Sequence, residues 1–518
     1  RFGKNTCFYY FRMPSFSPIS MKNQLKMANR FPKRLISFCI ALLMASFTLQ
    51  AQESYYPMTL EKLEKAYSTY QEPALTHRRF KHTDLQPLIQ KNSIAFQVEK
   101  LGESIEGRSI ISLKWGDGKT KVMLWSQMHG NESTATMSLF DLFNFLEGKG
   151  DEYDELRSLL KEKLSLKFIP MINPDGAEAF KRRNSLDIDL NRDAISQISP
   201  EAVILKAARD NFEPEFGFNL HDQQTYYNVV NTPKQATISL LAPAYNYETE
   251  INEVRARAMQ TIAGMNELLQ QIIPGGVGKY DDAFEPRAFG DNIQKWGTST
   301  ILIESGGYPN DPEKQEIRKI NFMIILNALH QIATKGYEKY TTEQYFAIPD
   351  NGLQLVDLKI NEMLVMVNGK KYPVDLVIRR RESEASGSYF VSGAIDDLGD
   401  MQVYFGFEEL DASGLEFTEG KVYPNAFENV QQITFEKAME LLRQGFMAVK
   451  IKNGTARQLH GLPIQVLKST EKLSGGWTTA SAPNFFLSQN GELKYAVING
   501  YLIDLAKPKM QEFKNRIL

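Results

Sequence analysis

Short apolar runs alternate with segments of helical periodicity between residues 95 and 335 of this chain. An unbroken apolar run predicts a strand buried on both faces, and helices between such strands predict crossover connections in a layered fold. The pattern therefore predicts an α/β fold with a mixed central sheet flanked by helices. The expected strands are 121–126, 164–172, 215–220, 237–241 and 298–303, and the expected helices are 133–146, 248–271 and 312–334.

The pattern of apolar and polar residues changes near residue 345. Beyond it, short alternating runs predict strands, and a single amphipathic segment, 434–443, predicts a helix. The expected runs are 364–367, 374–378, 402–405 and 495–502. We therefore expect a catalytic domain over 95–340, a linker within 335–352, and a mainly-β accessory region over 345–518 that packs on the first domain or extends it.

Residues 1–51 have the composition of a targeting segment. They contain eight basic residues and no acidic ones, and they include a 13-residue apolar run at 35–47. A start near Met27 would give a basic segment, this apolar run and a small residue, Ala51, as in a secretory signal peptide. The run is shorter than the roughly 20 residues that cross a bilayer. We expect a cleaved signal and a periplasmic or secreted protein, with an N-terminal membrane anchor as the alternative.

The remaining chain is acidic and free of cysteine. Of 60 Lys and Arg residues, eight lie in 1–51, which leaves 52 against 62 Asp and Glu, a net charge of −10. Such a body does not indicate a nucleic-acid partner. Cys7 and Cys39 both lie in the expected signal region, so thiolate metal sites and cysteine nucleophiles are excluded from the mature chain. Residues 52–94 form an N-terminal segment of unassigned role.

Two of the six histidines stand where an expected strand meets a loop. His129 follows the strand 121–126, Glu132 comes three residues later, and His221 ends the strand that begins at 215. The carboxyl ends of strands in an open α/β sheet face the usual ligand crevice. Two histidines and one carboxylate are a common ligand set of catalytic zinc. His-x-x-Glu alone is a weak signal, and a hydrogen-bonded loop histidine is the alternative for His129.

Further polar groups follow other strands. Glu304 ends the strand 298–303, where burial would raise its pKa and suit it to act as a general base. A turn is expected at 173–176, a basic cluster stands at 181–183, and Asp189-Leu190-Asn191-Arg192 follows it. Arginine and asparagine side chains can clamp a carboxylate through paired hydrogen bonds.

In this order, the motifs resemble those of the M14 family of zinc carboxypeptidases over about residues 95–335. The resemblance implies one zinc ion per chain, held by His129, Glu132 and His221, with Glu304 as the general base. It implies that Asn191 and Arg192 grip the terminal carboxylate of a peptide. Arg182 would polarise the scissile carbonyl, with Arg183 as its rival, and Asp189 would orient His129.

The predicted function is hydrolysis of peptides near a free C-terminus by metal-activated water. The alternatives are a murein-peptide amidase of the same fold and a non-catalytic binding protein. Tyr280 is a candidate for the family's mobile tyrosine, and Asp291 is either a pocket residue or a helix cap. The basic stretch 77–82 is interpreted as a solvated surface. The sequence does not indicate which substrate side chains are preferred or what the oligomeric state is.

Overall fold

The computed structural model describes residues 58–518 except 386–387, 480 and 510. The upstream extension and the expected signal peptide lie outside the described residues, as do residues 52–57. None of the helices described within 58–518 is long and apolar enough to cross a membrane.

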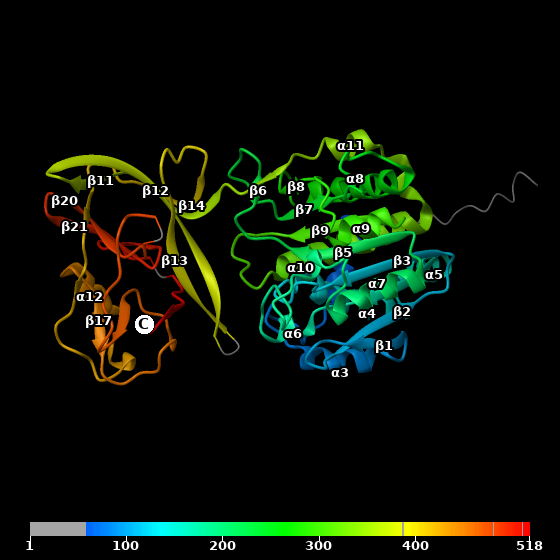
Figure 1. Ribbon diagram of the computed structural model, residues 1–518, viewed down its shortest axis with the longest axis horizontal. Helices are drawn as coiled ribbons and strands as arrows, with labels where there is room; N and C mark the ends of the chain where they lie inside the picture. The colour runs from blue at the N-terminus through cyan, green and yellow to red at the C-terminus, as the bar shows by residue number, and fades with distance from the viewer. Residues whose placement is uncertain (1–57, 386–387, 480, 510) are drawn as a thin grey trace, which may run out of the picture. The chain divides into compact units, whose positions relative to one another are not determined.

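An eight-stranded mixed sheet organises the first region (Figure 1). Its four central strands are parallel, and antiparallel neighbours flank them on both sides. Across the sheet the order is β1 (Gln97–Glu103), β2 (Ser109–Trp115), β4 (Leu164–Ile169), β3 (Thr120–Ser126), β5 (Phe216–Asp222), β9 (Ser299–Ser305), β7 (Ile238–Leu241) and β8 (Val277–Lys279). The predicted α/β fold with a mixed central sheet is confirmed, and each expected strand is present within a few residues of its expected bounds.

Helices cover the sheet on both faces. On one face, apolar residues of α7 (Pro200–Phe212) and α9 (Phe289–Lys295) form a core with Met123 and Trp125 of β3. Elsewhere α10 (Gln315–Thr334) contacts four helices: α2 (Leu60–Tyr70), α4 (Thr134–Glu147), α5 (Asp154–Lys163) and α8 (Glu253–Ile272). Within the segment 58–94, α2 and α3 (His82–Asn92) both contact α4.

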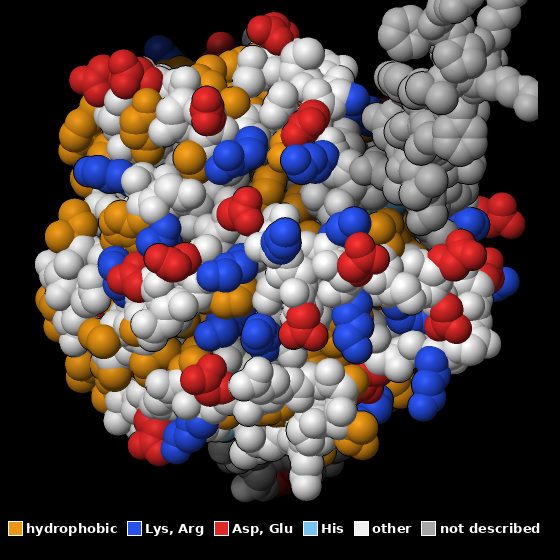
Figure 2. All heavy atoms as spheres, turned by 90° about the vertical axis from the view of Figure 1, so that its right-hand side faces the viewer, with side chains coloured by type: hydrophobic (Ala, Val, Ile, Leu, Met, Phe, Trp, Pro, Cys, Tyr) orange, Lys and Arg blue, Asp and Glu red, His pale blue; other side chains and the backbone are white. Residues whose placement is uncertain are grey.

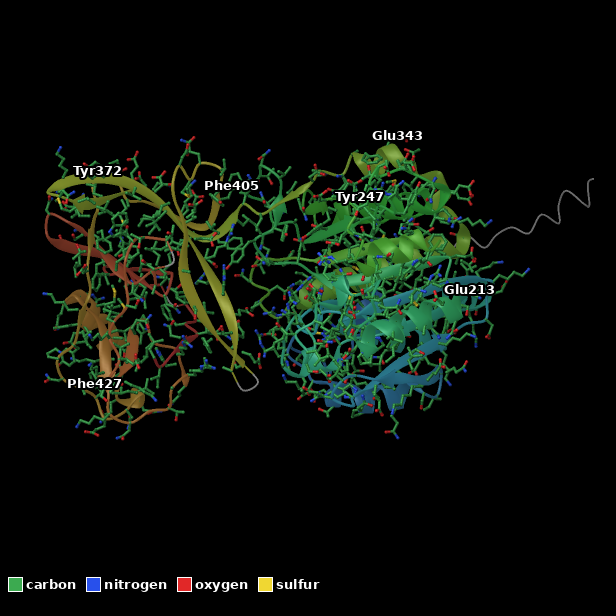
Figure 3. The ribbon with its side chains drawn as sticks, viewed as in Figure 1. Glu213, Tyr247, Glu343, Tyr372, Phe405 and Phe427 are labelled. Carbon is green, nitrogen blue, oxygen red and sulfur yellow. The ribbon has the colours of Figure 1, made fainter. Side chains whose placement is uncertain are left out.

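Two local predictions for this region need correction. The segment 173–176 is not a free turn but the start of α6 (Pro174–Glu178), because the Asn173 side chain accepts a hydrogen bond from the Gly176 N–H and Pro174 suits the first helical position. The expected linker 335–352 contains η2 (Gly336–Lys339), α11 (Thr342–Phe346, with Glu343 labelled in Figure 3) and β10 (Asn351–Gly352). Strand β10 pairs with β6 (Asn228–Val229), so this segment is tied to the first region.

The second region is mainly β, as predicted. Strands β13, β12, β11, β15, β20, β21 and β22 form a sheet in that order, and β14 pairs with β11. Their bounds are β11 (Leu355–Val367), β12 (Lys370–Ala385), β13 (Ser388–Gly399), β14 (Phe405–Asp411), β15 (Glu416–Thr418), β20 (Phe485–Gln489), β21 (Glu492–Ile498) and β22 (Tyr501–Asp504). A smaller parallel sheet contains β16 (Lys421–Val422), β17 (Phe446–Ile451) and β19 (Gln465–Lys468), and β18 (Leu459–His460) pairs with β23 (Asn515–Arg516). The predicted helix is α12 (Phe435–Arg443), and Thr434 caps it.

Two expected strands of this region differ from the structure. Residues 402–403 lie in a turn, in which Asp400 accepts a hydrogen bond from the Gln402 N–H, and the strand β14 begins only at Phe405 (Figure 3). The run 495–502 is split between β21 and β22 by Asn499 and Gly500, both at positive φ. Asn-Gly favours a tight hairpin turn, so the sequence did contain this signal.

Charges of both signs are interspersed on the face drawn in Figure 2, and neither sign forms a continuous patch there.

Away from the expected site, His330 is buried and His460 is partly buried. His330 lies in α10 and His460 in β18, and the Nε2 atom of each has no hydrogen-bond partner among the described residues. Burial lowers the pKa of His330 and of His460 to about 4. The unfolded chain therefore binds protons below about pH 6.5 that the folded chain does not.

We expect stability to fall as the pH drops from about 6.5 towards 4, by up to about 1.4 kcal/mol per pH unit for each of these histidines. The check is the urea unfolding midpoint at about pH 4.5 and pH 7.5 for the wild type and for the double variant His330→Gln/His460→Gln. The difference between the two pH values should shrink in the double variant. An unchanged difference would contradict this assignment.

Candidate metal centre and active-site cavity

A cavity of about 710 Å³ opens at the carboxyl ends of the central parallel strands. His129 lies three residues beyond β3, His221 lies near the end of β5, and Glu304 lies near the end of β9. In the register of β5 and β9, His221 pairs directly with Glu304. The register therefore brings a predicted ligand and the predicted base to the same edge of the sheet, and all three residues line the cavity.

His129, Glu132 and His221 form a tight buried cluster. Nδ1 of His129 lies 2.8 Å from Oε1 of Glu132, and Nδ1 of His221 lies 2.7 Å from Oε2 of the same carboxylate. The two Nδ1 atoms are 3.1 Å apart. The relative exposure of these residues is 2%, 7% and 2%. The structure thus brings together the three residues predicted as metal ligands.

Asp189 fixes the orientation of the His129 ring. Its Oδ1 lies 3.0 Å from Nε2 of His129. A carboxylate only accepts hydrogen bonds, so Nε2 of His129 donates to Asp189, and Nδ1 is the ring nitrogen that faces Glu132 and His221. Burial opposes ionisation of Asp189, but hydrogen bonds from His129 and Arg182 hold the pKa of this carboxyl below its usual range. This is the role that the resemblance implied for Asp189.

The cluster attracts positive charge. Nη1 of Arg182 lies 3.2 Å from Oε1 of Glu132 and 3.1 Å from Nδ1 of His129, so both accept from the guanidinium. Burial disfavours the Glu132 carboxylate, yet the neighbouring His129 and His221 hold its pKa well below the usual range.

These properties fit a metal ion. Two imidazole nitrogens and an ionised carboxylate, buried and mutually facing, match the two-His, one-carboxylate set that catalytic zinc uses. A histidine that binds zinc through one ring nitrogen usually donates a hydrogen bond from the other nitrogen to a carboxylate, a carbonyl or water, as His129 does to Asp189. The chain's own residues therefore fit zinc.

Close backbone packing explains the glycine in the His-x-x-Glu turn. A Cβ on Gly130 would lie 1.9 Å from the backbone carbon of Gly176, where no side chain fits. The backbone of Gly130 itself is not in the left-handed region, whereas Gln127 is, with φ at 47°. Gly130 thus allows the start of α6 to approach the turn that carries His129 and Glu132.

Glu304 lies at the cavity wall between charged neighbours. Burial raises its pKa well above the usual value, and the negative charges of Glu132 and Asp222 raise it further. The prediction from sequence missed two contributors, Asp222 and Lys314. Nζ of Lys314 donates to Asp222 at 3.1 Å and to the Ser305 carbonyl at 2.8 Å.

Asn191 and Arg192 also line the cavity, and each has a partner. Oδ1 of Asn191 accepts from the Phe289 N–H at 2.8 Å, and Nε of Arg192 lies 3.3 Å from Glu285. Of the two rival arginines, Arg182 lines this cavity. Arg183 donates to the Asp187 carbonyl and lines a neighbouring hollow instead.

Tyr280 and Asp291 line the same cavity. The hydroxyl groups of Tyr280 and Tyr227 are 2.8 Å apart. Asp291 accepts from the Glu285 N–H at 2.9 Å, in the first turn of α9, and burial raises its pKa to about 7. Asp291 therefore both lines the cavity and holds the segment that precedes its helix.

The interpretation of 77–82 as a solvated surface is wrong for its two arginines. Arg79 is 5% exposed, and Arg78 is largely buried. Both line the cavity and pair with Glu382 of β12, from the second region, and Arg79 also pairs with Glu384. Nothing in the local sequence links these segments, because they meet only in the folded chain.

Loss of the Asp189 carboxylate should weaken zinc binding by about 10- to 100-fold, because the His129 ring would no longer be held with Nδ1 towards the cluster. The measurement is competition with a zinc chelator for Asp189→Ala and for the control Asp210→Ala, which removes an exposed carboxylate paired with Lys206. Equal zinc affinity in Asp189→Ala and the wild type would contradict this role.

Comparison with known proteins agrees with this geometry. A model of the family described as zinc carboxypeptidase matches residues 82–258, which include His129, Glu132 and His221 but not Glu304. An uncharacterized protein of Zymomonas mobilis is 27% identical over 168 residues, which cover 32% of this chain and 42% of that protein. Cytosolic carboxypeptidase 6 of Mus musculus is 28% identical over 172 residues, which cover 30% of this chain and 31% of that protein.

Solved structures similar to this chain include a metallo-carboxypeptidase from Burkholderia cenocepacia, with 17% identity, a TM-score of 0.39, and coverage of 50% of this chain and 70% of that one. The chain spans less than half the length of the curated relatives named above. Over residues 82–258, the chain is therefore similar to the zinc carboxypeptidase family, M14.

Proposed function

We propose that this protein is a zinc-dependent metallocarboxypeptidase that hydrolyses peptide bonds near the free C-terminus of peptides. The observation that carries the proposal is the convergence of the His129–Glu132–His221 cluster and Glu304 in one cavity. The family match supports it, and so does the name of the mouse relative.

A zinc ion at this site fits the proposed hydrolysis of a peptide bond by water. Zinc held by His129, Glu132 and His221 would supply Lewis-acid chemistry, which acidifies water and polarises a carbonyl. Glu304, with its raised pKa, is suited to take a proton from the attacking water and return it to the leaving amine.

Two arginines have complementary tasks in this proposal. Arg182 has a half-exposed side chain, so it can turn from Glu132 to donate to the oxyanion of the substrate. Arg192, together with Asn191, would hold the substrate's terminal carboxylate, since a guanidinium binds a carboxylate through two parallel hydrogen bonds. No covalent intermediate with the enzyme is required.

The expected compartment follows from residues 27–51 only. We propose export to the periplasm or beyond the cell, where peptides and murein fragments are both available. A peptide with a free C-terminal carboxylate is the proposed partner.

The direct check of this proposal uses peptide pools with either free or amidated C-termini, with products read by mass spectrometry. Zinc-loaded protein should remove residues from the free termini only, and a chelator should abolish the reaction. Arg192→Ala should lose activity on free termini by about 100-fold, because one charge-assisted contact to the carboxylate is removed. Glu285→Gln removes the ion-pair partner of Arg192 but keeps the arginine, and serves as the matched control.

Cleavage of amidated and free peptides at equal rates would contradict the assigned role of Arg192. No cleavage of either pool by zinc-loaded protein would contradict the carboxypeptidase itself. Turnover of murein peptides in that case would favour the amidase, and its absence would favour the binding protein.

A further inference from the structure

The active-site cavity is completed by the C-terminal region. Glu382 and Glu384 of β12 line it together with His129, His221 and Glu304. The two glutamates are alternate residues of one strand, so they lie on the same face of that strand. A β-rich region that only packed on the outside of the catalytic domain would not contribute to this cavity.

Four charged side chains join β12 to the catalytic domain. Nη2 of Arg78 donates to both oxygens of Glu382, at 3.0 and 3.1 Å. Arg79 donates to Glu382 at 2.6 Å and to Glu384 at 3.1 Å. Hydrogen bonds between ionised groups are stronger than neutral ones.

The position of Arg79 is fixed further by aromatic rings. Its guanidinium carbon lies 4.3 Å from the ring centre of Phe180 and 4.2 Å from that of Tyr389, the second residue of β13. The β12 strand has a second anchor, because the Arg380 N–H donates to the Tyr226 hydroxyl at 3.1 Å. The contact is therefore specific and held at two points.

The wall formed by Arg78, Arg79, Glu382 and Glu384 lines the same cavity as the ligand His221. The backbone N–H of Arg78 donates to Glu313 at 2.9 Å, and the next residue, Lys314, pairs with Asp222. Arg192, the proposed carboxylate-binding residue, is held instead by Glu285. Arg192 and the wall therefore line one cavity together with the metal cluster.

The cavity is of moderate size and only partly enclosed. Its volume of about 710 Å³ lies in the range of pockets that enclose small molecules. A long chain would need an open groove through which the rest of the peptide leaves the cavity.

From the charged wall that β12 adds to this cavity we infer that Glu382 and Glu384, held by Arg78 and Arg79, are specificity-determining residues that restrict the enzyme to short peptides. This inference rests on the proposed carboxypeptidase function. The C-terminal region acts as the part of the enzyme that selects substrates by length.

The test compares a tripeptide with a long unstructured peptide that ends in the same three residues. Full-length zinc-loaded wild type should have a kcat/KM for the tripeptide that is about tenfold or more above that for the long peptide. In Glu382→Gln/Glu384→Gln this ratio should fall by about fivefold or more, chiefly through a lower KM for the long peptide. The control Glu416→Gln, which removes the Lys371–Glu416 ion pair within the same sheet, should keep the wild-type ratio.

Binding of both peptides to zinc-loaded Glu304→Gln, which lacks the proposed base, is measured in parallel by calorimetry. Tighter binding of the tripeptide than of the long peptide is expected there too. If the double variant does not fold, the single variant Glu384→Gln replaces it, because its glutamine can still accept from Arg79.

Cleavage of both peptides at equal kcat/KM, or an unchanged ratio in the folded variant, would overturn the length selection and leave the carboxypeptidase intact. Length-dependent binding without any cleavage by the wild type would support the wall and contradict the proposed function. Failure of both peptides to bind would overturn both.

Discussion

The mutual approach of two imidazole nitrogens and one carboxylate is the constraint on which the rest of the site depends. Three groups that can each offer a lone pair are buried within about 3 Å of one another. Such a cluster needs positive charge among or beside its members. Asp189 turns His129 towards the cluster, Arg182 supplies positive charge from one side, and the donor set fits zinc.

The parallel strands make this approach possible. Their carboxyl ends meet at one edge, so residues distant in sequence, such as His221 and Glu304, become direct neighbours in register. Gly130 then allows the start of α6 to pack against the turn that carries the other two ligands. The site is thus a product of sheet topology first and of local turns second.

Much of this arrangement could be predicted because the signals are local. Strands buried on both faces are unbroken apolar runs, and the polar residues after β3 and at the ends of β5 and β9 mark the functional edge. His129 and Glu132 are three residues apart, so their proximity needs no tertiary information. The resemblance to a family then assigned roles that spacing alone does not.

The unpredicted features depend on tertiary contacts. Arg78 and Arg79 belong to a stretch that looks solvated, because a basic run carries no sign of the carboxylates that neutralise it in the fold. Lys314 and Asp222 pair across 92 positions of the chain. The start of α6 was missed although Asn173 and Pro174 are good helix-start residues, because Asn-Pro-Asp-Gly also has the composition of a turn.

The measurement that tests the central claim most directly is anomalous diffraction at the zinc absorption edge from crystals of zinc-loaded protein. One strong peak among Nδ1 of His129, Nδ1 of His221 and the Glu132 carboxylate is the predicted result. A zinc peak elsewhere, with these three side chains unchanged and no peak among them, would contradict the account.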